Sequence, residues 1–185
     1  MAYAIISPSW AGFQPSSVTD TGAFLPSNNV SASTTTYIPQ PPLALGMVVQ
    51  AVDPTFGTGE FILLLGVAST VVGSLVRWNA TTYQTTLVVN TAVQVAPVAV
   101  AMSANVAASW GWYQISGNAV LKKTAVAVSP NVPVFLSATA GRVKAIASAG
   151  LQVVGCRSAN LATVTSTTST ITVTIDRPHL QSQIT

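Results

Sequence analysis

Charge is what this sequence has least of. Only 6% of its 185 residues are Asp, Glu, Lys or Arg, whereas a typical soluble domain has about 25%. The seven cations include one adjacent pair, Lys122 and Lys123, while nucleic-acid-binding proteins gather Lys and Arg so that many phosphates are neutralised together. We therefore expect no nucleic-acid partner. A surface so poor in charge is weakly protected against association, which is a first indication of a subunit.

Groups for catalysis or metal binding are equally scarce, with one cysteine, one histidine and four acidic residues. Cys156 and His179 could pair as nucleophile and base, with Asp176 orienting the histidine. However, Asp176 and His179 flank Pro178 beyond the last expected strand, so we expect an exposed exit segment and a buried, inert Cys156. The set cannot form a zinc site or a calcium loop of usual spacing. We expect no enzyme activity, no metal and no cofactor.

Long apolar runs are also missing. The best run, residues 61–68, is well short of the ~20 residues that a spanning helix needs. No Lys or Arg precedes the first apolar residues, as it would in a signal peptide. We therefore expect no membrane partner, and synthesis in the cytoplasm.

The first 42 residues differ in composition from the rest, being rich in Ser, Thr and Pro. Proline disfavours helices and central strands, so this part is predicted to be an extended N-terminal arm. A β domain over residues 43–180 and a tail over 181–185 would follow. Spaced aromatic residues favour an arm that docks on a surface, and a disordered tail is the alternative. These aromatic residues are Trp10, Phe13, Phe24 and Tyr37.

Short β-type runs follow from residue 43. Residues 60–65 are expected to form a strand buried on both faces, residues 93–102 an edge strand because of Pro97, and residues 103–109 a short helical turn. Pro178 is expected to end the last strand. Hairpins are predicted over residues 110–121, turning at Ser116-Gly117-Asn118, and over residues 132–146. Further strands are expected at residues 46–52, 71–78, 83–89, 151–157 and 171–175.

About nine to eleven short strands predict an all-β fold. We expect a compact antiparallel sandwich or barrel, β-tulip-like or jelly-roll-like, with the extended arm and at most one short helix. Trp110 and Trp112 alternate along one expected strand and should share a face. They would either pack in a core or an interface, or stack on a sugar.

The order of several segments resembles small head proteins of tailed bacteriophages, of the decoration or cement type. The resemblance runs from about residue 43 to 178, and "GWYQISG" with "ATAGRV" is similar to lambda-type head decoration domains. The segments are LGMVVQAVD (45–53), GEFI (59–62), GVA (66–68), VGSLV (72–76), PVAVAMS (97–103), GWYQISG (111–117) and ATAGRV (138–143).

This resemblance implies a compact β-fold that forms trimers on the outer surface of a virion head, with an N-terminal arm that orders on the shell. The implied function is to clamp neighbouring major capsid proteins, so the implied partners are the major capsid protein and further copies of this chain. No motif fixes the contact surface. The candidate contact residues are therefore the aromatic ones: Trp10, Phe13, Phe24, Tyr37, Trp110 and Trp112.

Three other functions are kept as hypotheses. The first is a glycan-binding or receptor-binding head-fibre or tail module with a jelly-roll-like fold. It would require Trp110, Trp112, Tyr83 or Trp78 to be exposed on one groove. The second is a hydrolase acting through Cys156, and the third is a minor shell or plug subunit.

Overall fold

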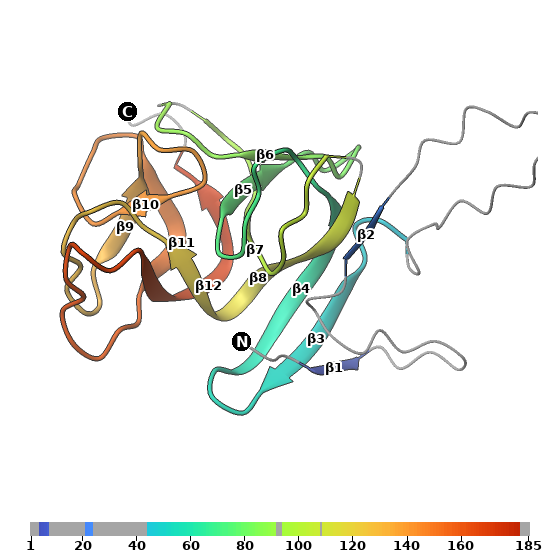
Figure 1. Cartoon of the computed structure of the whole chain (residues 1–185), viewed down its shortest axis with the longest axis horizontal. Coiled ribbons are helices and arrows are strands. Elements are labelled where there is room, and N and C mark those ends of the chain that lie inside the picture. The colour runs from blue at the N-terminus through green and yellow to red at the C-terminus, as the bar shows by residue number, and fades with distance from the viewer. Residues whose placement is uncertain (1–3, 8–20, 24–43, 92–93, 108, 182–185) are drawn as a thin grey trace, which may run out of the picture.

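The computed structural model describes residues 4–7, 21–23, 44–91, 94–107 and 109–181. All regular structure in this part of the chain is β, with twelve strands in one curled antiparallel sheet that forms a half-barrel (Figure 1). The expected all-β class is confirmed. No helix forms in the described part of residues 103–109, where a helical turn was predicted.

The sheet follows the order β1-β3-β4-β8-β12-β11-β9-β10, with β2, β5, β6 and β7 branching from it. The strands are β1 Ala4–Ser7, β2 Thr21–Ala23, β3 Val48–Asp53, β4 Gly57–Leu65, β5 Leu75–Trp78, β6 Thr85–Leu87, β7 Val98–Ala101, β8 Ser109–Lys122, β9 Pro133–Leu136, β10 Val143–Lys144, β11 Gln152–Ser158 and β12 Thr170–Leu180.

Five strands on one side of the molecule pair in a ring. β4 pairs β8, β8 pairs β7, β7 pairs β5, and β5 pairs β6. A parallel bridge between Leu65 and Gln84 returns from the start of β6 to the end of β4. We call this the first ring, and its interior is a buried cluster that comprises Ile62, Leu64, Val76, Ala99, Ala101, Tyr113 and Ile115.

Five strands on the other side form a second ring, in the order β8, β12, β11, β9, β10. A parallel bridge between Lys123 and Val143 closes it. The buried Lys123 amine donates hydrogen bonds to the carbonyls of Val126 and Thr165, both at 2.9 Å. The Lys123 amine thus links the two loops that cap this ring by hydrogen bonds. Its burial lowers the pKa of Lys123.

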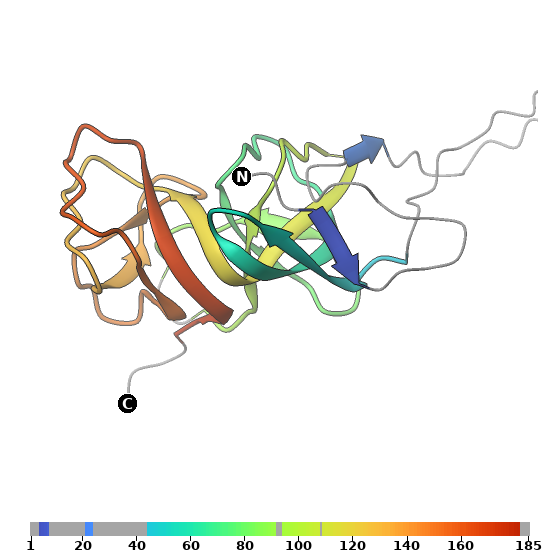
Figure 2. The same ribbon diagram turned by 90° about the horizontal axis from the view of Figure 1, so that it is seen from below.

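Strand β8 belongs to both rings (Figures 1 and 2). Its first half pairs with β4 and its second half with β12, and Ser116 pairs with both. The predicted hairpin turn at Ser116-Gly117-Asn118 is therefore wrong. Gly117 has a φ of +96° and bends the strand without reversing it. The Gln114 side-chain amide donates to the carbonyls of Ser116 and Asn118, so backbone acceptors at the bend are satisfied.

Strand β7 is the wall between the two interiors, and all four of its residues are buried. Val98 and Val100 face the second interior, whereas Ala99 and Ala101 face the first. The prediction of an edge strand from Pro97 is wrong, because Pro97 precedes the strand and β7 pairs on both sides. A strand that is buried on both faces requires an apolar side chain at every position, and β7 contains only Val and Ala.

Strand β12 continues to Leu180, past the proline that was expected to end it. Between the pairs Cys156–Ile175 and Val154–His179, Gly155 alone stands opposite residues 176–178. This bulge accommodates Pro178, which has no donor for a regular ladder. The bulge turns Arg177 and Pro178 towards the first ring.

The remaining expectations are mostly confirmed, with changed boundaries. β4 is buried on both faces over Phe61 to Leu64, and β9 and β10 form the second predicted hairpin. The strand expected from residue 71 begins at Leu75, because residues 71–74 form a turn. Within the first 42 residues, β1 pairs with β3 and β2 pairs with the start of β8.

Candidate functional site

Two of the six candidate contact residues, Trp110 and Trp112, lie within the described structure. Trp10, Phe13, Phe24 and Tyr37 lie outside the described residues. Trp110 and Trp112 share a face of β8, as expected, and are 9% and 0% exposed. They pack with apolar residues of β3 and β4, including Val49, Phe61 and Leu63. The indole side chains of Trp110 and Trp112 therefore both belong to a hydrophobic core.

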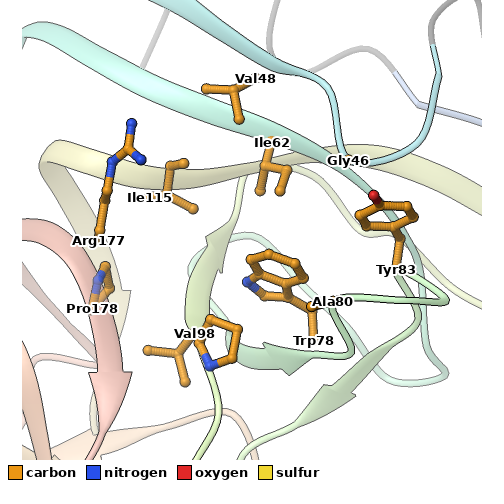
Figure 3. A pocket seen from close by; sticks show the side chains of 11 residues that line it. Gly46, Val48, Ile62, Trp78, Ala80, Tyr83, Val98, Ile115, Arg177 and Pro178 are labelled. Atoms are coloured by element: carbon orange, nitrogen blue, oxygen red, sulfur yellow. The ribbon is translucent and has the colours of Figure 1, made fainter.

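An apolar groove of about 330 Å³ opens at the mouth of the first ring (Figure 3). It lies where the start of β3, the end of β5 and the β12 bulge meet, and we call it the Trp78 groove. Its volume is at the lower end of the ~300–1,000 Å³ usual for ligand pockets. The side chains that line it are Val48, Ile62, Trp78, Ala80, Tyr83, Pro97, Val98, Ile115, Arg177 and Pro178, with Gly46.

Two aromatic rings form one wall of the groove. Trp78 and Tyr83 stack with ring centroids 6.4 Å apart and planes at 22°. The turn between them is fixed by Asn79, whose side-chain oxygen accepts from the backbone N–H groups of Thr81 and Thr82. Tyr83 has a φ of +57°, an uncommon conformation for a residue with a bulky side chain. The backbone of this turn therefore holds the tyrosine ring in place.

Gly46 lets the tyrosine ring lie flat against the chain that leads into β3. A Cβ atom built on Gly46 would lie 2.3 Å from Cε1 of Tyr83, and Gly46 itself has a φ of +81°. Its N–H donates to the carbonyl of Leu63, which anchors this approach to β4. Both the space and the backbone conformation thus require glycine.

The opposite wall comes from the β12 bulge (Figure 3). Pro178 is buried, and Arg177 reaches across to Glu60 of β4 in an ion pair of 2.9 Å. The two charged side chains are 68% and 25% exposed, so the pair contributes little to stability. The pair matters mainly for ligand binding: Arg177 is the one charged residue of the lining, and its charge is already balanced by Glu60.

The polar side-chain groups of the lining are mainly hydrogen-bond donors. The buried indole N–H of Trp78 has no hydrogen-bond partner in the described part of the chain. The half-buried Tyr83 contributes a hydroxyl, which can donate and accept. Arg177 offers only donors. In Figure 3 the indole nitrogen faces the side of the groove where Arg177 and Pro178 lie. The groove is therefore apolar, close to neutral and rich in donors relative to acceptors.

The Cys156, His179 and Asp176 hypothesis can be compared directly with the structure. Cys156 is buried in the second ring, and burial raises the pKa of its thiol to about 12. The side chains of Asp176 and His179 are exposed, although they belong to β12 and not to an exit segment. No hydrogen bond joins these three side chains in the described structure, and the buried thiol is neutral at ordinary pH.

Within the described ranges, no three His, Cys, Asp or Glu side chains come together as a metal site would require. The same residues contain no helix of the length and apolarity needed to cross a bilayer.

The fold and the groove define an all-β protein in which two strand rings share a central strand. No model of a known protein family and no curated protein matches the chain.

Sequence reasoning found part of the groove. Trp78 and Tyr83 were named as rings that a binding groove would need, and both lie on one, whereas Trp110 and Trp112 do not. Gly46, Pro97 and Pro178 were missed as lining residues. The prolines were interpreted only as strand breakers, and no local pattern reveals that an approach loop and a distant bulge meet.

Proposed function

We propose that this protein is a structural decoration protein of a phage head, which binds the outer surface of the shell and clamps neighbouring major capsid proteins. One observation carries the proposal: a surface with few charges that also exposes large aliphatic side chains. Among the described residues, nine Val, Ile and Leu side chains are exposed, from Val48 in β3 to the fully exposed Leu161. Few charges and many exposed aliphatic groups favour wide protein contacts.

The double-ring architecture is compatible with that role. A clamp requires contact area and a stiff body, and a standard interface buries about 800 Å² per partner. β8 fixes the two rings to one another, while β1 and β2 add main-chain pairing from the part of the sequence that was predicted to reach the shell. A homotrimer on the shell, repeated around the head, would add avidity.

The proposal is tested by adding the purified protein to heads that lack it. Particle mass should rise in steps that saturate, and the temperature of heat-induced DNA release should increase. Light scattering of the free protein reports whether it is a trimer. Saturating protein that adds no mass to the particles would refute head binding, and bound protein without any gain in heat resistance would refute the clamp.

The candidate contact residues allow a sharper version of this assay. Trp10→Ala and Phe24→Ala should weaken head binding while the unfolding midpoint stays unchanged. Thr163→Ala is the matched control, because Thr163 is exposed and belongs neither to the candidate contact residues nor to the exposed aliphatic side chains. Equal head binding by all three variants and the parent protein would remove these aromatic residues from the proposed contact surface.

The glycan-binding or receptor-binding module is a second candidate function. The observation that favours it is the stacked Trp78 and Tyr83 pair at an open groove, since amphipathic rings are common in recognition sites. A glycan array tests it, and binding that is lost in Trp78→Ala would support it.

A further inference from the structure

We propose that the Trp78 groove binds an extended, proline-bearing peptide segment of another protein. This inference goes beyond decoration of a head and holds whether or not the protein sits on one. It rests on three properties of the groove: its shape and size, its balance of donors and acceptors, and its charge.

The shape suits proline rings. The stacked rings of Trp78 and Tyr83 face the buried Pro178 and its neighbours across an apolar floor that includes Ile62 and Ile115 (Figure 3). Proline-rich segments adopt the polyproline II conformation, which docks in aromatic-lined grooves and loses little conformational entropy on binding. A volume of about 330 Å³ accommodates a few residues of such a segment, not the face of a folded domain.

The hydrogen-bonding groups suit the same ligand. A polyproline II segment has no internal hydrogen bonds, so its carbonyls are free to accept. Its prolines have no N–H, so pressing them against an apolar wall leaves no buried donor unpaired. The half-buried Tyr83 side chain carries a hydroxyl that can donate to one of these carbonyls. The indole N–H of Trp78 is buried and has no partner in the described structure, so it leaves an unsatisfied donor at the same wall.

A sugar fits this lining less well. Each sugar hydroxyl is both a donor and an acceptor, whereas Trp78 and Arg177 offer donors only and the Tyr83 hydroxyl is the one side-chain group of the lining that can accept. An anionic ligand is also disfavoured, because Arg177 is the one charged lining residue and is paired with Glu60. The chemistry therefore selects a neutral ligand that has acceptors and few donors.

The experiment titrates the full-length protein with a fluorescently labelled oligoproline peptide. The peptide control replaces every proline with alanine and should bind at least about tenfold more weakly. Tyr83→Phe keeps the ring stack but removes one donor, so affinity should fall by about 5–10-fold, as expected for one hydrogen bond. Leu161→Ala, the exposed control residue on another surface, should bind as the parent protein does.

A second readout follows binding in the parent protein, and a variant serves only to assign one signal. The four tryptophans give separate indole N–H signals in a nitrogen-15 NMR spectrum, and that of Trp78 is assigned by its loss in Trp78→Phe. Oligoproline should move this signal, while those of the buried Trp110 and Trp112 stay in place. The inference is overturned if the two peptides bind equally or not at all, or if the Trp78 signal does not move. A glycan that binds and shifts this signal where oligoproline does not would make the groove a sugar site and also overturn it.

Discussion

Replacing Gly46 with alanine should lower the free energy of unfolding by about 2–4 kcal/mol. An L-residue held at the φ of +81° found here carries strain of about 1–3 kcal/mol. The new Cβ would also lie 2.3 Å from Cε1 of Tyr83, so the ring must turn away. It would then lose its stacking on Trp78, an interaction of about 0.5–1.5 kcal/mol.

Gly57→Ala is the matched control. Gly57 has a φ of +76°, but an added Cβ would meet no atom within 4 Å. The substitution therefore introduces similar backbone strain without a steric clash, and it should cost only that strain of about 1–3 kcal/mol. Urea unfolding followed by circular dichroism gives both values, provided that the slope of the transition is unchanged.

A double variant isolates the contact between the two residues. Once Tyr83→Ala has removed the ring, Gly46→Ala should cost no more than Gly57→Ala, so the two substitutions should be strongly non-additive. The reasoning is refuted if Gly46→Ala and Gly57→Ala are equally destabilising in the parent protein, or if the double variant is additive.

Three further predictions concern buried and charged groups. Lys123→Met should destabilise the protein by about 2–4 kcal/mol in urea unfolding, because buried carbonyls such as that of Thr165 lose their donor; a loss below about 1 kcal/mol would contradict this. Burial raises the pKa of Cys156 from 9.0 to about 12, so its contribution to stability is complete below pH 9 and should be lost between about pH 9 and 12. Cys156→Ala should lack that part of the decline, and parallel pH curves for the two proteins would refute it. Glu60→Gln should cost at most about 1 kcal/mol, because its partner Arg177 is well exposed. That cost should vanish in about 1 M NaCl, and a larger, salt-independent loss would show a structural role for the pair.

Local pattern was sufficient for the fold class and for most strands. Alternation along residues 171–175 and the unbroken apolar run of residues 60–65 correctly indicated one strand packed on one face and one packed on both. The wrong predictions of a hairpin turn, an edge strand and a strand end all occur where a glycine or proline has a role in tertiary packing, whereas the helical turn predicted from Ala in residues 103–109 does not form at all. Ser116-Gly117-Asn118 has the composition of a turn, but in the structure this segment continues β8 and pairs with β4 and β12. Pro178 fits within β12 because Gly155 opposes a three-residue bulge.

The candidate site was predicted only in part, for a physical reason. Aromatic residues are identifiable as possible recognition groups from the sequence alone, and Trp78 and Tyr83 were named on that basis. Which aromatic residues line a surface depends on what covers each face of the sheet. That is set by the closure of the first ring and by the approach of Gly46, neither of which leaves a local signal.

Because β8 belongs to both strand rings, the chain cannot be divided into two fragments that each fold alone. No cut in the chain leaves two self-sufficient halves, because a fragment that keeps β8 leaves the other ring open along an unpaired edge. Fragments that separate β4 from β12 should therefore fail to fold alone and should regain structure only when mixed. The two strand rings should therefore fold and unfold together, so the smallest unit of this architecture that can fold is the pair of rings and not a single ring.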